Sequence, residues 1–597
     1  MTKVLATGTG DRTSVVFDLA PASSSTQFMS RHSRRKRSRA PDGRQPTLGI
    51  DGPAVPLEAL PVSDASFDRG DRAALFFGND RLDVYLRRTG QRVTLQVASL
   101  IDKVDVTTLM ASYSPIGRHA VHPRIMLGLL AYGMMRGVSS LRALEDMARV
   151  DLGAMWICRG VQPDHSAIGK FVVRHAAIVT EEFFEQFVRD LARNLGIRAG
   201  DAAIDGTVIE SAASRFRTVR AEAARQAADQ ARTDAETARG RAERDTHDDP
   251  AGASAPCAAP SATEPQAAAS RGGNDPPPAA QQHKIQRAER RAEQAERVAQ
   301  IAEQRAAARD AKDGKGDTVR VSPTDPDAVI QPRKDGAVRP AYKPSVIATP
   351  DRFIVGQCVH SASETAAVED LLDQHAANLG ADPSTIMLDA GYHSTSMAAL
   401  FVKRELDALV PSGQAFDDAH FERKRASKLF DKREFRYDEK QDAYICPADR
   451  LLRPRASVID RHGKRYRPFI GQQCTDCPRR VECTASKAGV RKINRYDGEQ
   501  FVAALDEVMK QPAARAKYRK RQAIVEPVFA GLRERLGLRR FRRKGLLRVR
   551  AEFTIYCFAY NLQRAVSFAR RGAAPGGGGE HRRQVVVLIL VVRIRLA

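Results

Sequence analysis

The sequence predicts an α/β fold in which buried strands deliver acidic residues to the edge of a sheet. A short apolar stretch, Ala202-Ala203-Ile204, ends at Asp205, and a second, Thr385–Leu388, ends at Asp389. Helical hydrophobic periods surround both stretches. An Ala-rich heptad pattern between them predicts helices where further strands would otherwise be expected. We therefore expect an α/β core with a helical N-terminal domain, a helical-hairpin insertion and a small Cys-rich insertion.

The N-terminal part divides into an extension and a helical domain. Residues 1–85 are rich in Ser, Arg, Pro and Asp without a sustained period, so we expect a disordered extension. Residues 90–198 show helical periods and form the expected N-terminal domain. In it, His122-Pro123 begins a helix that Gly137 ends, because Pro suits the first turn and Gly the C-terminus.

Two further helices of this domain have capping candidates. Ser139 or Ser140 caps one, and Asp164 or Ser166 caps the other, since short polar side chains satisfy the free N–H groups of a first turn. The last helix of the domain is expected at Glu181–Leu195.

An insertion is expected over residues 215–330. Arg215–Asp245 and Gln281–Asp310 are rich in Ala, Arg, Glu and Gln, and Pro250–Ala280 between them has the composition of a flexible connector. This predicts an antiparallel helical hairpin, although a solvated helix pair without a partner is the alternative. The second segment repeats small or apolar residues with steps of three and four: Ile285, Ala288, Ala292, Ala295, Ala299, Ala302 and Ala306.

The α/β core is expected to span residues 199–570 around this insertion. Tyr342–Ala348 and Phe353–Val359 read as a β-hairpin, and Glu364–Asn378 as a helix. Three more helices are expected after the second acidic strand end, and residues 571–597 form a tail of different composition. The three helices are Glu499–Met509, the basic helix Tyr518–Leu536 and the apolar helix Glu552–Phe568.

The charge of the chain indicates a polyanionic partner, with nucleic acid the leading candidate. Lys and Arg number 96 against 72 Asp and Glu, which gives a formal net charge of 96 − 72 = +24. Basic residues cluster at Arg31–Arg39 and more densely at Arg533–Arg550. A solvated face is the alternative reading of each cluster. The candidate phosphate contacts of the second cluster are Arg539, Arg540, Arg542, Arg543 and Lys544.

The cysteine content and the apolar segments favour a reducing cytoplasm. Eight Cys in 597 residues do not resemble a disulfide framework, and the N-terminus lacks the apolar core and cleavage site of a signal peptide. The apolar run Val585–Val592 is far shorter than the roughly 20 residues of a membrane-spanning helix. We expect no membrane association.

Four cysteines have the ligand type and number of a structural zinc site, which we expect in the Cys-rich insertion at residues 430–490. They include one Cys-x2-Cys pair, and four thiolates leave no open coordination position for catalysis. The alternative is a set of scattered buried thiols, because the outer spacings are irregular. The four are Cys446, Cys474, Cys477 and Cys483.

Three carboxylates form the candidate catalytic site. Asp205 and Asp389 end buried strands, and Glu526 lies on the later basic helix. Carboxylates brought together need a cation, and hard oxygen ligands suit Mg²⁺ or Mn²⁺. Two such ions about 4 Å apart would activate water and stabilise a leaving 3′ oxygen in phosphodiester cleavage. The alternative is that the strand-end aspartates only make turns and caps.

Several blocks, in matching order over roughly residues 90–570, resemble bacterial insertion-sequence DDE transposases. Asp205-Gly206-Thr207 with Glu210–Ser214 is similar to their first-aspartate block, and Leu388–Ser394 to their second. Tyr518, Arg521, Glu526 and Arg533 are similar to their tyrosine, arginine, glutamate, lysine signature. Within this superfamily the chain most resembles insertion-sequence family eleven-eighty-two.

The resemblance implies a ribonuclease-H-like catalytic core that acts on the terminal inverted repeats of its own element and on target DNA. It implies Asp205, Asp389 and Glu526 as the catalytic metal ligands for Mg²⁺ or Mn²⁺. Tyr518, Arg521 and Arg533 become DNA contacts together with the basic cluster. A homo-oligomer on double-stranded DNA, in the bacterial cytoplasm and associated with the nucleoid, follows from the same likeness.

The sequence departs from the family pattern at three points. Four residues separate Arg521 from Glu526 where three are usual, Arg533 replaces a Lys, and Lys343 stands where relatives commonly have Asn. Arg keeps the charge of Lys but grips phosphate as a planar fork. Because no carboxylate is lost, an active transposase is expected. The alternative is a catalytically inactive DNA-binding relative that acts as a repressor or domesticated protein.

Overall fold

A computed structural model describes residues 67–572, except for 115–118, 215, 248–278, 334–335, 413–428, 457 and 462–463. The first 66 residues of the expected extension lie outside the described residues, as do the connector up to residue 278 and the tail from residue 573.

The expected extension is too long, because residues 67–85 are structured. They form β1 (Phe67–Asp68), β2 (Phe76–Phe77), β3 (Asp80–Arg81) and the start of α1 (Leu82–Arg88). Phe67 and Leu82 are buried, and β1 pairs in parallel with β4 (Ala120–Val121) of the helical region. Two-residue strands are too short to show a hydrophobic period, so the pattern did not reveal them.

The helical region that follows has the expected caps. The Pro123 helix, α4, begins with a proline in its first turn, and His122 Nδ1 accepts a hydrogen bond from the backbone N–H of Arg124 at 3.2 Å. Ser140 caps α5, and Asp164 caps α7 by accepting from Ala167 N at 2.8 Å. The helices are α2 (Arg92–Ile101), α3 (Thr107–Met110), α4 (Pro123–Met135), α5 (Leu141–Val150), α6 (Leu152–Ile157), α7 (His165–Arg174), α8 (Ala176–Ile178) and α9 (Phe184–Leu195).

The expected helix Glu181–Leu195 is divided. A π-helical turn at Val179–Phe183 precedes α9, and Gly196 ends α9 in the left-handed conformation with φ 66°. Phe183, Phe184 and Phe187 bury this segment against the last helix of the chain.

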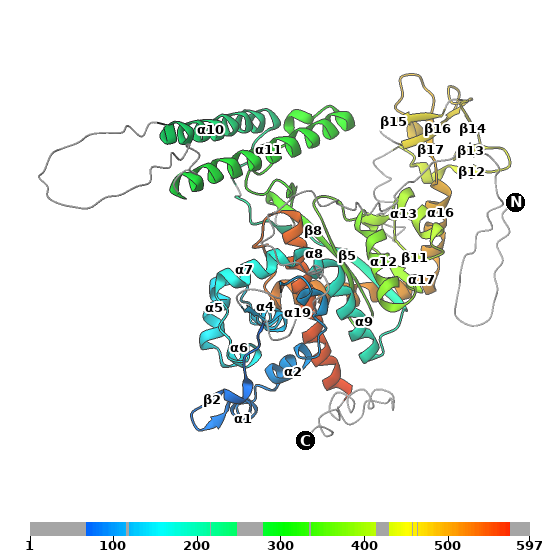
Figure 1. Cartoon of the computed structure of the whole chain (residues 1–597). Helices are drawn as coiled ribbons and strands as arrows, with labels where there is room; N and C mark the ends of the chain where they lie inside the picture. The colour runs from blue at the N-terminus through cyan, green and yellow to red at the C-terminus, as the bar shows by residue number, and fades with distance from the viewer. Residues whose placement is uncertain are drawn as a thin grey trace, which may run out of the picture.

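A mixed sheet forms the centre of the molecule, which makes the fold α/β as expected (Figure 1). β5 (Asp201–Gly206) lies beside β10 (Thr385–Met387) in parallel, and β10 lies beside β11 (Asp407–Leu409) in parallel. On its other side β5 pairs antiparallel with β8 (Val338–Ala348), which pairs antiparallel with β9 (Ile354–His360). Two short strands, β6 (Ile209–Glu210) and β7 (Val329–Pro332), also pair with β8. The expected β-hairpin at residues 342–359 is confirmed as part of this sheet.

Helices from both ends of the chain pack on this sheet. α12 (Ala367–Leu379) lies against β9 and α9, and α13 (Thr395–Lys403) follows the second acidic strand end. The last helix, α19 (Leu546–Gly572), packs against β9 and α4, where the Asn561 side chain bonds both backbone polar groups of Ile354. The C-terminal helix therefore joins the helical region to the sheet.

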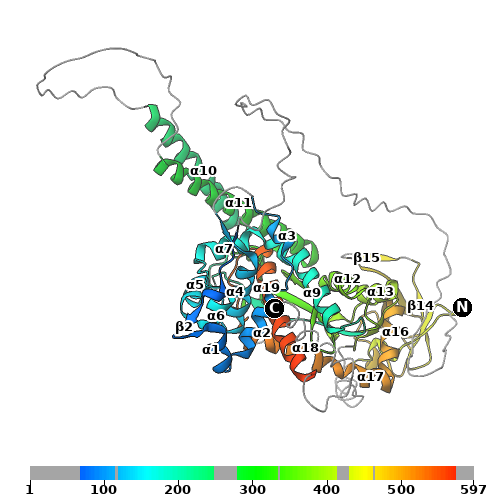
Figure 2. The same cartoon turned by 60° about the horizontal axis from the view of Figure 1, so that its bottom comes forward.

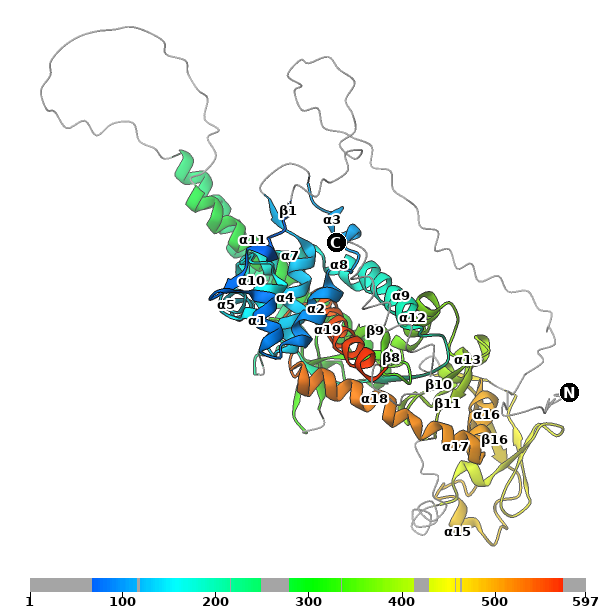
Figure 3. The same ribbon diagram turned by 90° about the horizontal axis from the view of Figure 1, so that it is seen from below.

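The expected basic helix is broken into three pieces that run along one side of the molecule (Figure 3). They are α17 (Pro512–Tyr518), α18 (Lys520–Ala530) and a π-helical turn at Gly531–Arg535, preceded by α16 (Glu499–Lys510). Pro527 lies inside α18, where it lacks the N–H for the helical ladder. α18 packs against β5 and β8.

The insertion forms the expected antiparallel hairpin, which projects from the body of the molecule (Figure 2). Its helices are α10 (Ala221–His247) and α11 (Ala279–Asp313). Arg225 pairs with Glu303, Arg232 with Glu296 and Arg239 with Glu289, so the two helices run in opposite directions. Small residues lie between them at the base: Ala224, Ala228, Val298, Ala299 and Ala302.

The Cys-rich region contains an antiparallel sheet that its sequence pattern did not predict. Its strands are β12 (Arg436–Asp438), β13 (Ala443–Ile445), β14 (Leu451–Pro454), β15 (Ile459–Arg461), β16 (Lys464–Gly471) and β17 (Lys492–Tyr496). A separate small core fills it, made by Phe430, Phe435, Tyr444, Leu452, Phe469 and Ile493. In the part of the chain that the structure describes, no helix has the length and apolar character needed to cross a membrane.

Candidate functional site at the edge of the central sheet

Asp205 and Asp389 lie side by side because their strands are parallel neighbours. In the register of β5 and β10, Thr385 faces Asp201 and Met387 faces Ala203. Asp205 and Asp389 each follow this last pair by two residues, Asp205 within β5 and Asp389 just after β10, so the same register places them level with each other. The carboxyl ends of parallel strands are the usual place for a site in an α/β fold.

Backbone N–H groups orient both carboxylates. Asp205 Oδ1 accepts from Gly206 N at 3.0 Å, and Asp389 Oδ1 accepts from Gly391 N at 2.8 Å. Asp389 is the N-cap of a 3-10 turn, Ala390–Tyr392, so it both caps this turn and remains at the sheet edge.

Arg521 supplies a buried counter-charge to Asp205. Its guanidinium lies 3.0 Å from Asp205 Oδ1, and only 9% of the residue is exposed. Burial raises the pKa of Asp205, Arg521 opposes this shift, and the nearby charges of Asp389 and Glu364 raise the pKa further. The net result is a raised pKa for Asp205, which is typical of acids gathered in one site.

Glu526 lies on the same helix as Arg521 but on its exposed side. The residue is exposed, whereas Arg521, Val525 and Val528 of α18 are buried. The structure brings Asp205 and Asp389 together and leaves Glu526 facing solvent. Among the described residues, the carboxylate oxygens of Asp205, Asp389 and Glu526 do not all lie within 4.8 Å of one another.

The predicted DNA contacts of the signature occupy different environments. Arg521 is turned inward onto Asp205, and its predicted contact with DNA stays a prediction. Tyr518 and Arg533 are half-buried, and burial lowers the pKa of Arg533 while the charge of Asp205 raises it. Arg533 also lies over the ring of Phe529, 5.8 Å from its centroid. Tyr518 and Arg533 both lie near the aspartates, since the charge of Asp205 acts on each of them.

The basic cluster is divided between exposed and internal cations. Arg539, Arg542 and Lys544 are exposed. Arg540 instead donates to the backbone oxygens of Ser211 at 2.8 Å and Ala213 at 2.6 Å, so its guanidinium holds the loop after β6. Arg543 is half-buried, and burial lowers its pKa. The predicted cluster thus divides into cations that face solvent and cations that are half-buried.

The four predicted zinc ligands converge on one small hollow beside the antiparallel sheet, which all four line. Burial raises the pKa of Cys483, and the other three thiols contribute to the same shift. Cys446 Sγ accepts from the backbone N–H of Ala448 and Arg450 at 3.4 and 3.3 Å. No three of these sulfurs all lie within 4.8 Å of one another in the described residues.

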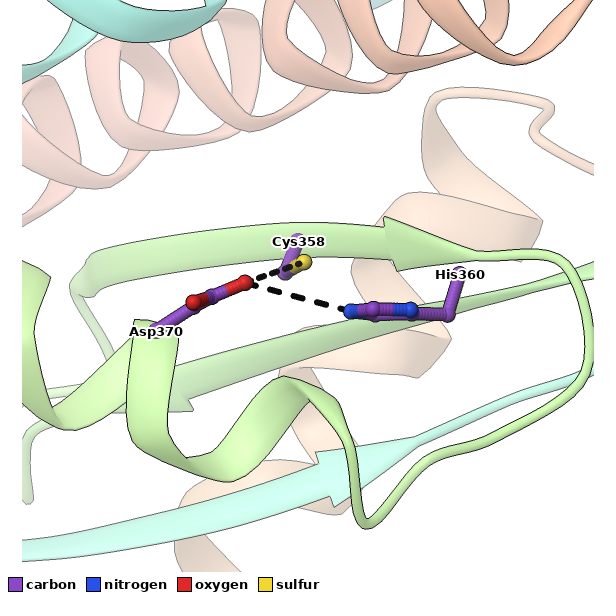
Figure 4. A group of neighbouring side chains, drawn as sticks. All are labelled: Cys358, His360 and Asp370. Atoms are coloured by element: carbon purple, nitrogen blue, oxygen red, sulfur yellow. Dashed lines mark hydrogen bonds and ion pairs between the residues drawn. The ribbon is translucent and has the colours of Figure 1, made fainter. Parts of the chain in front are cut away.

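A second group that could hold a metal ion lies at the end of β9 (Figure 4). Cys358 and His360 project from the strand toward Asp370 on α12, with Asp370 Oδ2 3.7 Å from Cys358 Sγ and 3.9 Å from His360 Nε2. Burial raises the pKa of Cys358 to about 12, so its thiol stays protonated and donates to Asp370. Burial lowers the pKa of His360, and the nearby charge of Arg550 lowers it further and opposes a further cation. The sequence had given Cys358 no role.

Several residues of the sheet edge escaped the sequence interpretation. The charge of Glu364 adds to the burial that raises the pKa of Asp205, and burial together with the charges of Glu364 and Asp205 raises the pKa of Tyr392. Neither Glu364 nor Tyr392 belongs to a hydrophobic period of the sequence. Lys343, noted as a departure from relatives, lies 3.4 Å from Glu364. His393 Nε2 lies 2.9 Å from Asp506 Oδ1 on α16.

Two segments match models of known protein families. Residues 445–566 match a family described as "Transposase DDE domain", and residues 87–174 match one described as "Transposase domain (DUF772)". No curated protein matches the chain. The first match includes Glu526 and the four cysteines and begins after both aspartates. DDE-type domains imply a divalent metal and a DNA substrate. Together the two matches support a transposase function for this chain.

Proposed function

We propose that the protein is a DDE transposase that cleaves DNA at the ends of its element and transfers the cut strand to target DNA. Asp205, Asp389 and Glu526 are the metal-binding catalytic carboxylates of this proposal. The observation that carries it is the pair of aspartates standing level at the ends of β5 and β10, beside the helix whose segment matches the DDE family. A homo-oligomer on inverted-repeat DNA belongs to the same proposal.

The donor set at the sheet edge fits Mg²⁺ or Mn²⁺. Both aspartates offer oxygen ligands, and buried hydroxyls of Thr207, Ser345 and Tyr392 have no hydrogen-bond partner in the described residues. Hard cations prefer such all-oxygen surroundings and often retain water. A bound ion would supply Lewis-acid stabilisation of the leaving 3′ oxygen and activation of the nucleophile.

The protein's own residues supply positioning and charge. Gly206 N and Gly391 N fix the two aspartates, and Arg521 offsets the charge of Asp205. Arg533 at the approach offers a planar fork for a phosphate, as an arginine does for bidentate recognition. Glu526, on the exposed side of α18, would be the third carboxylate to hold the metal. The mixed sheet with acids at its parallel strands supports a ribonuclease-H-like core.

Cleavage of a DNA end tests this function. Asp205→Asn and Asp389→Asn should each lower Mg²⁺-dependent cleavage of element-end DNA by about a thousandfold or more, because the metal contributes several kcal/mol to the transition state. Equilibrium binding of the same DNA should change by less than about threefold, since phosphate contacts come from cations. Undiminished cleavage by either variant would contradict the proposal. Wild-type binding without any cleavage would favour an inactive DNA-binding relative.

The four cysteines are proposed to hold a structural Zn²⁺. Two backbone N–H groups are directed at Cys446 Sγ, and hydrogen bonds of this kind orient metal ligands. Purified protein should contain one zinc per chain, and Cys477→Ser should lose it and expose the 430–496 region to protease. Cys358→Ser is the matched control and should retain the zinc. Wild-type protein that contains no zinc by elemental analysis would contradict the site.

A further inference from the structure

Glu364 lies over the peptide that follows Asp205. It precedes α12, and its backbone oxygen accepts from Ala367 N at 3.1 Å in the turn that starts the helix. A Cβ atom placed on Gly206 would stand 2.9 Å from Glu364 Cγ and 3.0 Å from its Cδ. Any side chain at position 206 would therefore collide with the Glu364 side chain. The glycine allows the Glu364 carboxylate to approach the strand end that carries Asp205.

Two further acids and two cations lie near this carboxylate, although the oxygens of Asp205, Asp389 and Glu364 do not all lie within 4.8 Å of one another in the described residues. Lys343 Nζ lies 3.4 Å from Glu364 Oε1, and Arg521 lies 3.0 Å from Asp205 Oδ1. Three acids, Asp205, Asp389 and Glu364, thus lie beside two paired cations, and the charge of Asp205 also acts on Arg533. Each of the two cations pairs with a different acid, and Asp389 keeps its contact with Gly391 N.

Two buried hydroxyl groups beside these acids are free to form further hydrogen bonds. Ser345 Oγ lies 3.0 Å from the Cβ position of Gly206, on the same side as Glu364, and Ser345 is fully buried. Neither Ser345 Oγ nor Tyr392 OH has a hydrogen-bond partner in the described residues. Burial raises the pKa of Tyr392, with Glu364, Asp205 and Asp389 contributing. An isolated buried hydroxyl is costly, so its presence beside the acids indicates a polar ligand.

We propose that Glu364 is a fourth carboxylate of the metal site and contributes an oxygen ligand to a divalent cation held beside Asp205. This inference rests on the proposed function, because it adds a ligand to the site that Asp205 and Asp389 define. Without the metal, Glu364 pairs with Lys343, which keeps the carboxylate oriented toward Gly206. A bound metal would replace Lys343 as the partner of Glu364. The ligand set then comes from β5, β10 and the loop before α12, in addition to α18.

Mn²⁺ affinity of the full-length protein tests the assignment without relying on activity. Glu364→Gln keeps the size of the side chain and removes its charge, and it should weaken Mn²⁺ binding at least about tenfold in an electron paramagnetic resonance titration. Glu369→Gln, on the exposed side of α12 five residues later, is the matched control and should bind Mn²⁺ like the wild type. Equal affinity of Glu364→Gln and the wild type would overturn the inference.

Lys343 gives a second measurement with the opposite sign. If Glu364 binds the cation, Lys343→Gln removes a competing charge and should tighten Mn²⁺ binding several-fold. If the pair is only structural, losing Lys343 should weaken binding or leave it unchanged, and either result would contradict the assignment. Melting temperatures of both variants verify that the fold is retained, and Glu364→Asp should recover part of the affinity.

Asp205→Asn separates failure of this inference from failure of the proposed function. Weakened Mn²⁺ binding in Asp205→Asn together with unchanged binding in Glu364→Gln would remove Glu364 from the site and leave the transposase proposal in place. Unchanged binding in both variants would remove the metal site itself. Weakened binding in both, with Glu369→Gln unaffected, is the expected result.

Discussion

The sheet edge and the projecting hairpin both pair arginines with carboxylates, in opposite surroundings. At the edge, Arg521 is 9% exposed and meets Asp205, whose pKa is raised by burial. On the hairpin, Arg225 bonds Glu296 and Glu303 across two exposed helix surfaces, and these bonds lower the pKa of both glutamates. Arginine–carboxylate pairs are thus buried at the sheet edge, whereas on the hairpin they form a series of solvent-exposed ion pairs, the hairpin ladder.

The contrast shows where charge indicates chemistry. A solvated ion pair gains little because water already satisfies both partners, so the hairpin ladder sets helix direction more than stability. A buried pair that is imperfectly satisfied persists only where the fold holds it in place. The unpartnered hydroxyls near Asp205 belong to that second kind.

Removing the arginine in each region gives the largest expected difference. Arg521→Gln should lower the free energy of unfolding by about 2 kcal/mol, because Asp205 loses the counter-charge of a partly buried pair. Arg225→Gln should leave unfolding unchanged within measurement error. Urea denaturation followed by the fluorescence of Trp156, the single tryptophan, measures both variants. Equal effects of the two variants would break the comparison.

The salt dependence of DNA binding should distinguish the exposed cations of the basic cluster from Arg540, which bonds backbone oxygens. Replacing the exposed Arg539, Arg542 and Lys544 by Ala should reduce the slope of log affinity against log salt by roughly 3, since each phosphate contact contributes about 0.9. Arg540→Ala should leave the slope intact and lower the melting temperature, because Ser211 O and Ala213 O lose their donor. Filter binding across salt concentrations measures the slopes. A drop of about 0.9 in the slope of Arg540→Ala would instead place that residue on DNA.

Much of the scaffold could be predicted from local patterns. Ala202-Ala203-Ile204 and Thr385–Leu388 are short apolar runs that end in acids, and both are strands of the central sheet. The three-four repeat of alanines predicted α11, because helix geometry places those residues on one face. Capping by Ser140 and Asp164 followed from side-chain chemistry alone.

The site was less accessible to sequence reasoning. Glu364 was taken as the start of a helix, and only the packing of its loop on Gly206 brings it to the strand end. Arg521 and Arg540 look like phosphate contacts in sequence, whereas tertiary structure turns them toward Asp205 and two backbone oxygens. The strands at residues 436–496 are short and rich in charged residues, so their alternation is weak. Long-range contacts of this kind leave no local period.

Acid should weaken the body of the molecule before the hairpin. His122 is 7% exposed and His175 fully buried, and burial lowers the pKa of each from 6.5 to about 4. A histidine with a lowered pKa takes up a proton more readily when unfolded, so it contributes stability that is lost as the pH falls from 6.5 toward about 4. The glutamates of the hairpin ladder have pKa values lowered from 4.5, so their contribution persists down to pH 4.5 and is lost only below it.

Hydrogen exchange of separate segments between pH 6.5 and 4.5 measures this difference. After correction for intrinsic exchange, protection of α4 and α7 should fall with pH while protection of α10 and α11 stays constant. His122→Asn retains an N-cap oxygen for Arg124 N and, combined with His175→Gln, should flatten the dependence in α4 and α7. A parallel loss of protection in both regions would show that the hairpin unfolds with the body. In that case its exposed ladder would depend on the buried core for its stability, and the two regions would form one cooperative unit.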